Sequence, residues 1–218
     1  MGYEKDQFYK LRGWEEDEEG NKKPPISGWE KDFDMEHYSF DIETVIVDKA
    51  SGKMEPFCIV IQRLKTKEFK VFWGINDCKT QFMDFLKDLL DMTGGRKNQK
   101  NKKAKKPKTC IWGFNSYRFD WLFFLKEIIT DIQDYEIIGS ATKIKTLKLG
   151  RNVYGMDYYT VYPCGSLDKQ HLSAYGADRA IQKGSIDWKN ITPDNILDHR
   201  EEIEKYCKID VQLLTDLL

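Results

Sequence analysis

Two acidic side chains, Asp41 and Glu43, stand two residues apart in a stretch of aromatic and β-branched residues that predicts a β-strand over 38–44. Successive side chains of a strand point to opposite faces, so the two carboxylates lie on the same face. Like charges held side by side repel, and solvent, a basic partner or a metal ion must offset the repulsion. Taken alone, the pair also fits an exposed acidic strand at the edge of a sheet.

Two more carboxylates stand at positions where packing alone is a poor explanation. A buried strand predicted at 109–114 leads through Asn115 to Asp120, which is expected in the first turn of a helix, where a negative charge is favoured. Helix-start chemistry accounts for Asp120, although it leaves Asn115 unexplained. Asp210 falls on the apolar face of a C-terminal helix, one turn after Tyr206. A carboxylate that faces a core is costly unless it is paired or binds a metal ion.

The elements that must position these side chains follow from the hydrophobic periodicity. Strands are predicted at 57–61 and 69–73, and their spacing from the strand at 38–44 predicts an antiparallel meander of the three. The other expected elements are an amphipathic helix over 79–92, a helix after Asn115 that runs to about 132, a hairpin at 145–156, a short helix from 166, a helix start at Thr192-Pro193 and a helix from about 201 to the C-terminus.

The composition is that of a globular protein, since 218 residues with 40% hydrophobic content suit one large domain or one domain with an extension. The formal net charge of −1 averages an acidic block at 15–19 and a basic run at 96–108. No apolar run reaches the ~20 residues of a membrane span and no signal peptide opens the chain, so we expect an intracellular protein without a membrane partner. The five cysteines lack paired spacing, which indicates reduced thiols and neither a disulfide framework nor a zinc site.

Two regions are expected to have little regular structure. Residues 1–36 are polar and interrupted by Pro24-Pro25, which predicts an N-terminal extension that precedes a domain at 37–218. Within that domain, residues 94–108 are expected to form a mobile basic loop, because dense like charge resists folding. The same run could contact the phosphates of a nucleic acid, and the two interpretations are compatible.

Three motifs carry a resemblance to a known family. F-D-I-E-T at 40–44, N-S-Y-R-F-D at 115–120 and Y-C-K-I-D at 206–210 resemble, in order and spacing, the motifs of DEDDy 3′–5′ exonucleases. The form is that of the proofreading domain of family B DNA polymerases, and the resemblance spans about 38–218. An isolated D-x-E is a weak signal, whereas three motifs in order with a tyrosine in the third are specific.

A narrower resemblance concerns the protein-primed branch of that family, found in phages, viruses and linear plasmids. K-G-S-I at 183–186 is similar to the K-x-x-hydrophobic motif of this branch, whose lysine assists catalysis. The branch usually has Ser-Leu after the aspartate that matches Asp157, whereas Tyr158 and Tyr159 stand here. The DNA contacts of that pair are therefore in question, and Tyr158 could stack on a base in their place.

The resemblance implies an α/β fold of the ribonuclease H-like kind, with a central mixed sheet, an antiparallel arrangement of its first three strands and helices on both faces. It implies two Mg²⁺ or Mn²⁺ ions, since carboxylate oxygens are the ligands that these ions prefer. The implied ligands are Asp41, Glu43, Asp120 and Asp210. Tyr206 would orient the attacking water and Lys183 would stabilise charge on the scissile phosphate. Thr44, Asn115 and Phe119 would contact the terminal nucleotides, although Phe119 also fits a place in the core.

The expected function is metal-dependent 3′–5′ exonucleolysis of single-stranded DNA ends, with proofreading as its purpose. The expected partners are the 3′ end of the strand, a polymerase domain of the same parent chain and, for the protein-primed branch, a terminal protein primer. A stand-alone DEDDy nuclease that acts on RNA or DNA is one alternative. A non-catalytic nucleic-acid-binding module is another, but a binder gains nothing by aiming four negative charges at phosphates.

Overall fold

The computed structural model describes residues 15–16, 22–23, 35–93, 108–140, 142–163, 165–177, 181 and 183–218. The chain divides into two compact units, Met1–Met35 and Glu36–Leu218. In the first unit, β1 (Glu15–Glu16) pairs antiparallel with β2 (Lys22–Lys23). Most of the predicted extension, and residues 94–107 of the predicted basic loop, lie outside the described residues, so their expected behaviour stays a prediction.

The second unit is built on a seven-stranded sheet in the order β5-β4-β3-β6-β9-β8-β7. Its first three strands along the chain are β3 (Met35–Asp48), β4 (Lys53–Arg63) and β5 (Phe69–Trp73), and they pair antiparallel, which confirms the predicted meander. The turn between β3 and β4 is closed by Asp48, whose Oδ1 accepts a hydrogen bond of 2.9 Å from the Ala50 amide. β3 lies between β4 and β6, so the strand that carries Asp41 and Glu43 is an interior strand.

The other half of the sheet places a parallel pair beside this meander. β6 (Lys108–Gly113) runs parallel to β9 (Val153–Asp157), and β9 pairs antiparallel with β8 (Lys143–Leu149). β8 and β9 confirm the predicted hairpin. β7 (Tyr135–Ser140) adds an outermost strand that the sequence did not predict. Its residues are mostly exposed and show no apolar alternation, so hydrophobic periodicity gave no sign of it.

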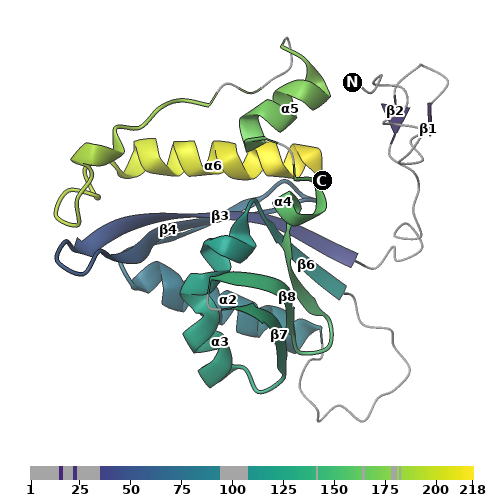
Figure 1. The fold of residues 1–218 in the computed structure, drawn as a ribbon, viewed down its shortest axis with the longest axis horizontal. Coiled ribbons are helices and arrows are strands. Elements are labelled where there is room, and N and C mark those ends of the chain that lie inside the picture. The colour runs from purple at the N-terminus through teal and green to yellow at the C-terminus, as the bar shows by residue number, and fades with distance from the viewer. Residues whose placement is uncertain are drawn as a thin grey trace. The chain divides into compact units, whose positions relative to one another are not determined.

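Helices cover both faces of the sheet, as predicted (Figure 1). On one face, α2 (Asp77–Met92) and α3 (Leu125–Asp131) pack against an aromatic core in which Phe40 contacts Trp121 with ring centroids 4.9 Å apart. On the other face, α6 (Arg200–Leu217) buries Cys207 and Val211 against the strands. The remaining short helices are α4 (Tyr158–Val161), α5 (Leu167–Tyr175) and the 3₁₀ helix η3 (Trp188–Asn190).

One predicted helix start is wrong, and the predicted helix after Asn115 differs in kind, although Asp120 does lie in a first helical turn. After Asn115 the chain forms two 3₁₀ helices, η1 (Ser116–Arg118) and η2 (Asp120–Phe124), and becomes α-helical only in α3. The segment after Thr192-Pro193 forms turns, and α6 begins at Arg200. The Thr192 amide donates to Asn195 Oδ1 at 2.7 Å and the Ile196 amide donates to the Thr192 carbonyl at 3.1 Å, so one capped turn forms here without continuing as a helix.

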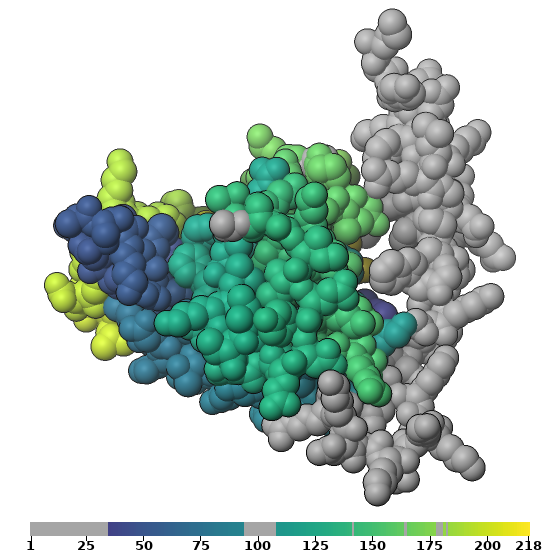
Figure 2. Space-filling model, turned by 60° about the horizontal axis from the view of Figure 1, so that its bottom comes forward, coloured from purple at the N-terminus to yellow at the C-terminus, as the bar shows by residue number. Residues whose placement is uncertain are grey.

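The loop that precedes α6 belongs to the core on the α6 face. Ile196 is 4% exposed and packs with Val45 and Phe57. Figure 2 shows the turn between β3 and β4 (dark blue) at one end of the surface and the segment from β6 to β9 (teal and green) across its middle. Among the described residues, no helix is long and apolar enough to cross a membrane.

Candidate active site

One cleft of about 310 Å³ collects most of the side chains that the sequence singled out. It opens where β3, the turn after β6, the segment at 183–188 and α6 meet. The residues that line it are Asp41, Ile42, Glu43, Phe114, Asn115, Phe119, Asp120, Lys183, Trp188, Tyr206 and Asp210. The four predicted carboxylates therefore share one cleft with Lys183 and Tyr206.

Asp41 and Glu43 stand on the face of β3 that packs against α6. Ser39 lies on the same face and its Oγ donates to the Val211 carbonyl of α6 at 3.3 Å, which ties this part of β3 to the helix. Burial and the charge of Asp210 raise the pKa of Asp41 to about 7. Burial and the charge of Asp41 raise the pKa of Glu43 to about 10. Ionisation of both carboxylates is therefore unfavourable unless positive charge is brought close to them.

The register of β3 changes at the end of this acidic pair. Glu43 stands opposite Cys58, whereas Thr44 stands opposite Pro56, so Phe57 of β4 has no partner in the register. A bulge of this kind suits Pro56, which has no amide hydrogen to give to a regular ladder. It also explains why the neighbours Phe57 and Cys58 both pack in the core on the α6 face.

Asp120 reaches the cleft through a tight turn after β6. A Cβ on Gly113 would lie 2.4 Å from Ser116 Cβ and 2.8 Å from Phe40 Cε1, so only glycine fits between strand and turn. Asn115 adopts the left-handed conformation with φ of 58°, which asparagine tolerates better than most residues. The turn leaves Asp120 5% exposed, and its burial, with Asp41 and Asp157 nearby, raises its pKa well above the ordinary value.

Asp210 is held by Lys183 and still has one oxygen without a partner. Lys183 Nζ lies 2.6 Å from Asp210 Oδ2. The other oxygen, Oδ1, is buried and has no hydrogen-bond partner among the residues that the structure describes. Burial raises the pKa of Asp210, although Lys183 opposes the rise. Burial of Lys183 disfavours its charge, but Asp210 and Tyr206 outweigh this effect and raise the pKa of the ammonium group.

Tyr206 completes the wall of the cleft next to this ion pair. Lys183 Nζ lies 4.2 Å from the centroid of the Tyr206 ring, and Trp188 meets the same ring edge-on at 5.5 Å between centroids. Burial raises the pKa of Tyr206, so its hydroxyl group keeps its proton near neutral pH. Tyr206 can therefore donate a hydrogen bond into the cleft.

The predicted nucleic-acid contacts divide into two groups. Asn115 and Phe119 line the cleft, and Phe119 is 39% exposed with its ring 5.2 Å from that of Phe123. This exposure argues against a core role for Phe119. Thr44 is not among the cleft residues, and Tyr158 is 6% exposed with its ring 4.9 Å from that of Tyr162. For Thr44 and Tyr158, contact with nucleic acid stays a prediction.

The structure also places at the site residues for which the sequence analysis proposed no role there. Trp188 and Phe114 line the cleft; Trp188 belongs to no motif or periodic pattern, and Phe114 was expected only as the last residue of the buried strand at 109–114. Asp157 is 3% exposed and close enough to Asp120 to influence its pKa. Cys207 lies against Asp41, and its place between Tyr206 and Asp210 in the third motif was the available signal.

The donor set fits divalent cations that prefer oxygen. Asp41, Glu43, Asp120 and Asp210 line one cleft in which Lys183 is the cationic lining residue, and carboxylates of this kind are typical ligands of Mg²⁺ and Mn²⁺. The unpartnered Asp210 Oδ1 and the raised pKa values of the carboxylates are features whose cost bound cations would lower.

Comparison of the sequence with protein-family models and with curated proteins finds no match. Among solved structures, the chain is similar to the family B DNA polymerase from the hyperthermophilic archaeon Pyrobaculum calidifontis, with a TM-score of 0.52 and 16% sequence identity. The match covers 82% of this chain and 23% of that polymerase, so the chain spans about a quarter of its length. The likeness, with the mixed sheet and its covered faces, confirms the expected α/β, ribonuclease H-like fold.

Proposed function

We propose that the protein is a metal-dependent 3′–5′ exonuclease that hydrolyses single-stranded DNA ends. The observation that carries this proposal is the convergence of four carboxylates from β3, η2 and α6 on one cleft, beside a lysine and a tyrosine. A structural carboxylate pair would be expected to have a cationic partner for each acid. In this cleft a single ammonium group among the described residues, that of Lys183, is the cationic partner of four carboxylates. The excess of negative charge favours the binding of cations, which in turn can bind a phosphate.

The chain's own groups have distinct tasks in this proposal. Asp41, Glu43, Asp120 and Asp210 would hold two Mg²⁺ or Mn²⁺ ions, which when bound stabilise the attacking and leaving oxygens of a phosphoryl displacement. Lys183 keeps its positive charge and faces the cleft, where it would stabilise the scissile phosphate.

Tyr206 and the aromatic wall serve orientation. The Tyr206 hydroxyl group stays protonated and would orient the attacking water by a hydrogen bond, without acting as a base. Asn115 and Phe119 line the cleft and would contact the last nucleotides of the strand, the amide by hydrogen bonds and the ring by stacking. We also propose that the domain belongs to a larger family B polymerase and proofreads its product, because its fold matches a part of such an enzyme.

The proposal is tested by digestion of a single-stranded DNA labelled at its 3′ end, in the presence and absence of Mg²⁺. The wild type is compared with Asp41→Ala plus Glu43→Ala. A matched control is Asp84→Ala plus Asp88→Ala, which removes two exposed acids from α2 on the other side of the sheet. We expect Mg²⁺-dependent shortening from the 3′ end by the wild type and by the control, and its loss in the first variant.

Two alternatives give different results in the same assay. Degradation of an RNA strand in preference to DNA would identify a ribonuclease of the same fold. Binding of the strand without degradation, equal in the wild type and in Asp41→Ala plus Glu43→Ala and independent of Mg²⁺, would refute the nuclease proposal in favour of a binding module.

A further inference from the structure

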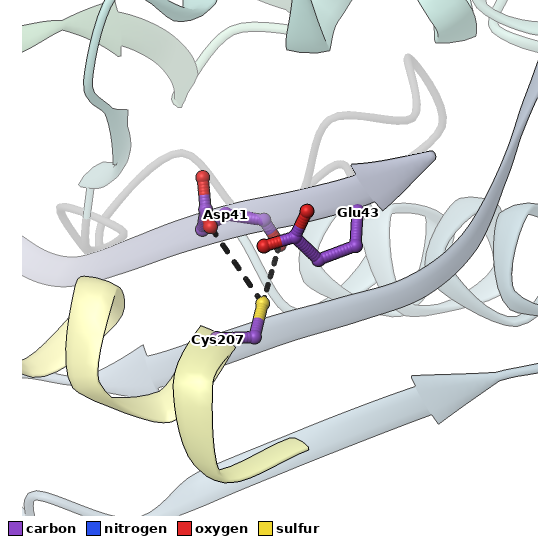
Figure 3. A group of neighbouring side chains, drawn as sticks. All are labelled: Asp41, Glu43 and Cys207. Atoms are coloured by element: carbon purple, nitrogen blue, oxygen red, sulfur yellow. Dashed lines mark hydrogen bonds between the residues drawn. The ribbon is translucent and has the colours of Figure 1, made fainter. Parts of the chain in front are cut away.

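A buried thiol lies beside the acidic pair of the cleft. Cys207 is fully buried on α6, and its Sγ lies 3.7 Å from Asp41 Oδ2 and 3.8 Å from the Asp41 carbonyl oxygen (Figure 3). Donor atoms of Asp41, Glu43 and Cys207 all lie within 4.8 Å of one another. In Figure 3 the carboxylate of Glu43 is directed toward Asp41, with the sulfur on the α6 side of the pair.

A second observation points to a ligand at this place. Asp210 follows Cys207 by three residues on α6, so the two side chains are neighbours on the helix surface. Asp210 is 9% exposed, it lines the same cleft as Asp41 and Glu43, and its Oδ1 has no hydrogen-bond partner within the described part of the chain. A buried oxygen without a partner is costly, and because Asp210 is near enough to Asp41 and Glu43 to raise the pKa values of both, a cation held by that pair would lower this cost.

The spacing of the donor atoms suits a tetrahedral ion with mixed oxygen and sulfur ligands. Zn²⁺ binds thiolate sulfur at about 2.3 Å and carboxylate oxygen at about 2.0–2.2 Å, which places the two donors about 3.5 Å apart at a tetrahedral angle. The distance between Cys207 Sγ and Asp41 Oδ2 is 3.7 Å. The oxygen that Glu43 offers lies within 4.8 Å of both atoms, so the three donors must move closer together to share one ion.

The sulfur ligand also determines which ions bind to these three side chains with the highest affinity. Mg²⁺ and Mn²⁺ prefer oxygen ligands and draw little from a thiolate, whereas Zn²⁺ and Cd²⁺ bind it strongly. We propose that Asp41, Glu43 and Cys207 form a site for a thiophilic divalent cation of the Zn²⁺ class. The thiol carries its proton in the metal-free protein and releases it to solvent when sulfur binds the ion.

Such an ion uses the same two carboxylates as the proposed catalytic ions, so it excludes them. The thiophilic cation is then an inhibitor of the nuclease. This consequence rests on the proposed function, whereas binding of the cation does not. Cys207 also packs with Val211 and Ile203 in the core, and a purely structural thiol is the competing explanation that the experiment must separate.

The experiment titrates the metal-free whole chain with Cd²⁺ and follows the ultraviolet absorption of the bond between thiolate and Cd²⁺. The variants are Cys207→Ser, which can keep a hydrogen bond to Asp41, and Cys207→Ala. The control is Cys78→Ser, a fully buried thiol of α2 on the opposite face of the sheet. Circular dichroism establishes that each variant is folded, and a competing titration with Zn²⁺ measures the affinity of the ion itself.

We expect one Cd²⁺ per chain with a thiolate band in the wild type and in Cys78→Ser, and no band in either Cys207 variant. Zn²⁺ should displace Cd²⁺, and the Zn²⁺ affinity should fall by about tenfold or more in Cys207→Ser. A wild type without the band, or a band that survives in the folded Cys207 variants, would overturn the inference. Exonuclease activity without the band would leave the proposed function intact, and the band without exonuclease activity would leave this site intact.

Discussion

The substitution Asp41→Asn should stabilise the metal-free protein although it removes a proposed metal ligand. Asparagine keeps the shape of the side chain and removes its charge. Burial and Asp210 raise the pKa of Asp41 from its ordinary value of 3.8 to about 7. At about 1.4 kcal/mol per pH unit, this rise corresponds to about 4 kcal/mol of unfavourable free energy for the ionised group. Because the amide must also be desolvated, we expect a gain of about 2–4 kcal/mol above pH 7.

The sign of this effect depends on pH. The pKa of Asp41 is higher in the folded than in the unfolded protein, so the native state binds more protons between about pH 4 and pH 7. The free energy of unfolding contributed by Asp41 is therefore highest at low pH and is lost as the pH rises toward 7. At pH 5 the wild type has lost only about 1.7 of this ~4 kcal/mol, so Asp41→Asn should gain clearly less there than at pH 8.

The assay is thermal unfolding in EDTA, followed by circular dichroism at about pH 5 and pH 8. A gain of 2 kcal/mol should raise the Tm by at least about 4 °C at the higher pH. Asp168→Asn is the control, because a hydrogen bond from Ser166 lowers the pKa of Asp168 and its neutralisation should not stabilise. An Asp41→Asn variant with the wild-type Tm at pH 8, or with an equal gain at both pH values, would refute the reasoning. Added Mg²⁺ should stabilise the wild type and not the variant.

Three further predictions concern the surroundings of the site. Gly113→Ala should cost about 1–3 kcal/mol in urea unfolding and reduce activity, because its Cβ would lie 2.4 Å from Ser116 Cβ; an unchanged midpoint would contradict the tight turn. Lys183→Met should destabilise the metal-free protein by about 1–2 kcal/mol, since it leaves Asp210 without its partner at 2.6 Å, and saturating Mg²⁺ should recover most of the loss in a thermal scan. Deletion of 96–108 should weaken binding of single-stranded DNA mainly at low salt. If the deletion variant binds as tightly as the wild type at low salt, the basic run is a loop without a role in DNA binding.

Much of the fold was accessible from periodicity, and its failures have physical reasons. The meander of β3, β4 and β5 and the helix α6 carry clear apolar patterns, so they could be predicted. β7 could not, because it is an edge strand with mostly exposed residues that contributes little to the core. The 3₁₀ turns of η1 and η2 also have no hydrophobic period, since their course is set by the close approach of Gly113 to Ser116.

The residues of the candidate site likewise include some that could be predicted from the sequence and some that could not. Asp41, Glu43, Asp120 and Asp210 could be predicted because their types and spacing conflict with ordinary packing. Trp188 begins the short 3₁₀ helix η3, which has no hydrophobic period, and only the folded structure brings it to Tyr206. Cys207 has no cysteine at a metal-binding spacing in the sequence, so a zinc site was not predicted. Its neighbours Asp41 and Glu43 come from a strand more than 160 residues earlier, and only the packing of α6 on β3 reveals them.

The packing of α6 on β3 has a consequence for how the protein acquires its shape. The acids of β3 and of α6 are separated by most of the chain of this unit, and such contacts form late because a long loop must close first. The strands can pair before the cleft exists, and the cleft is complete only when α6 docks. A partly folded chain then holds its acids apart and avoids most of their repulsion. Docking of α6 is therefore the step whose equilibrium divalent cations should shift, so that hydrogen exchange in α6 reports the binding of cations more directly than exchange elsewhere in the sheet.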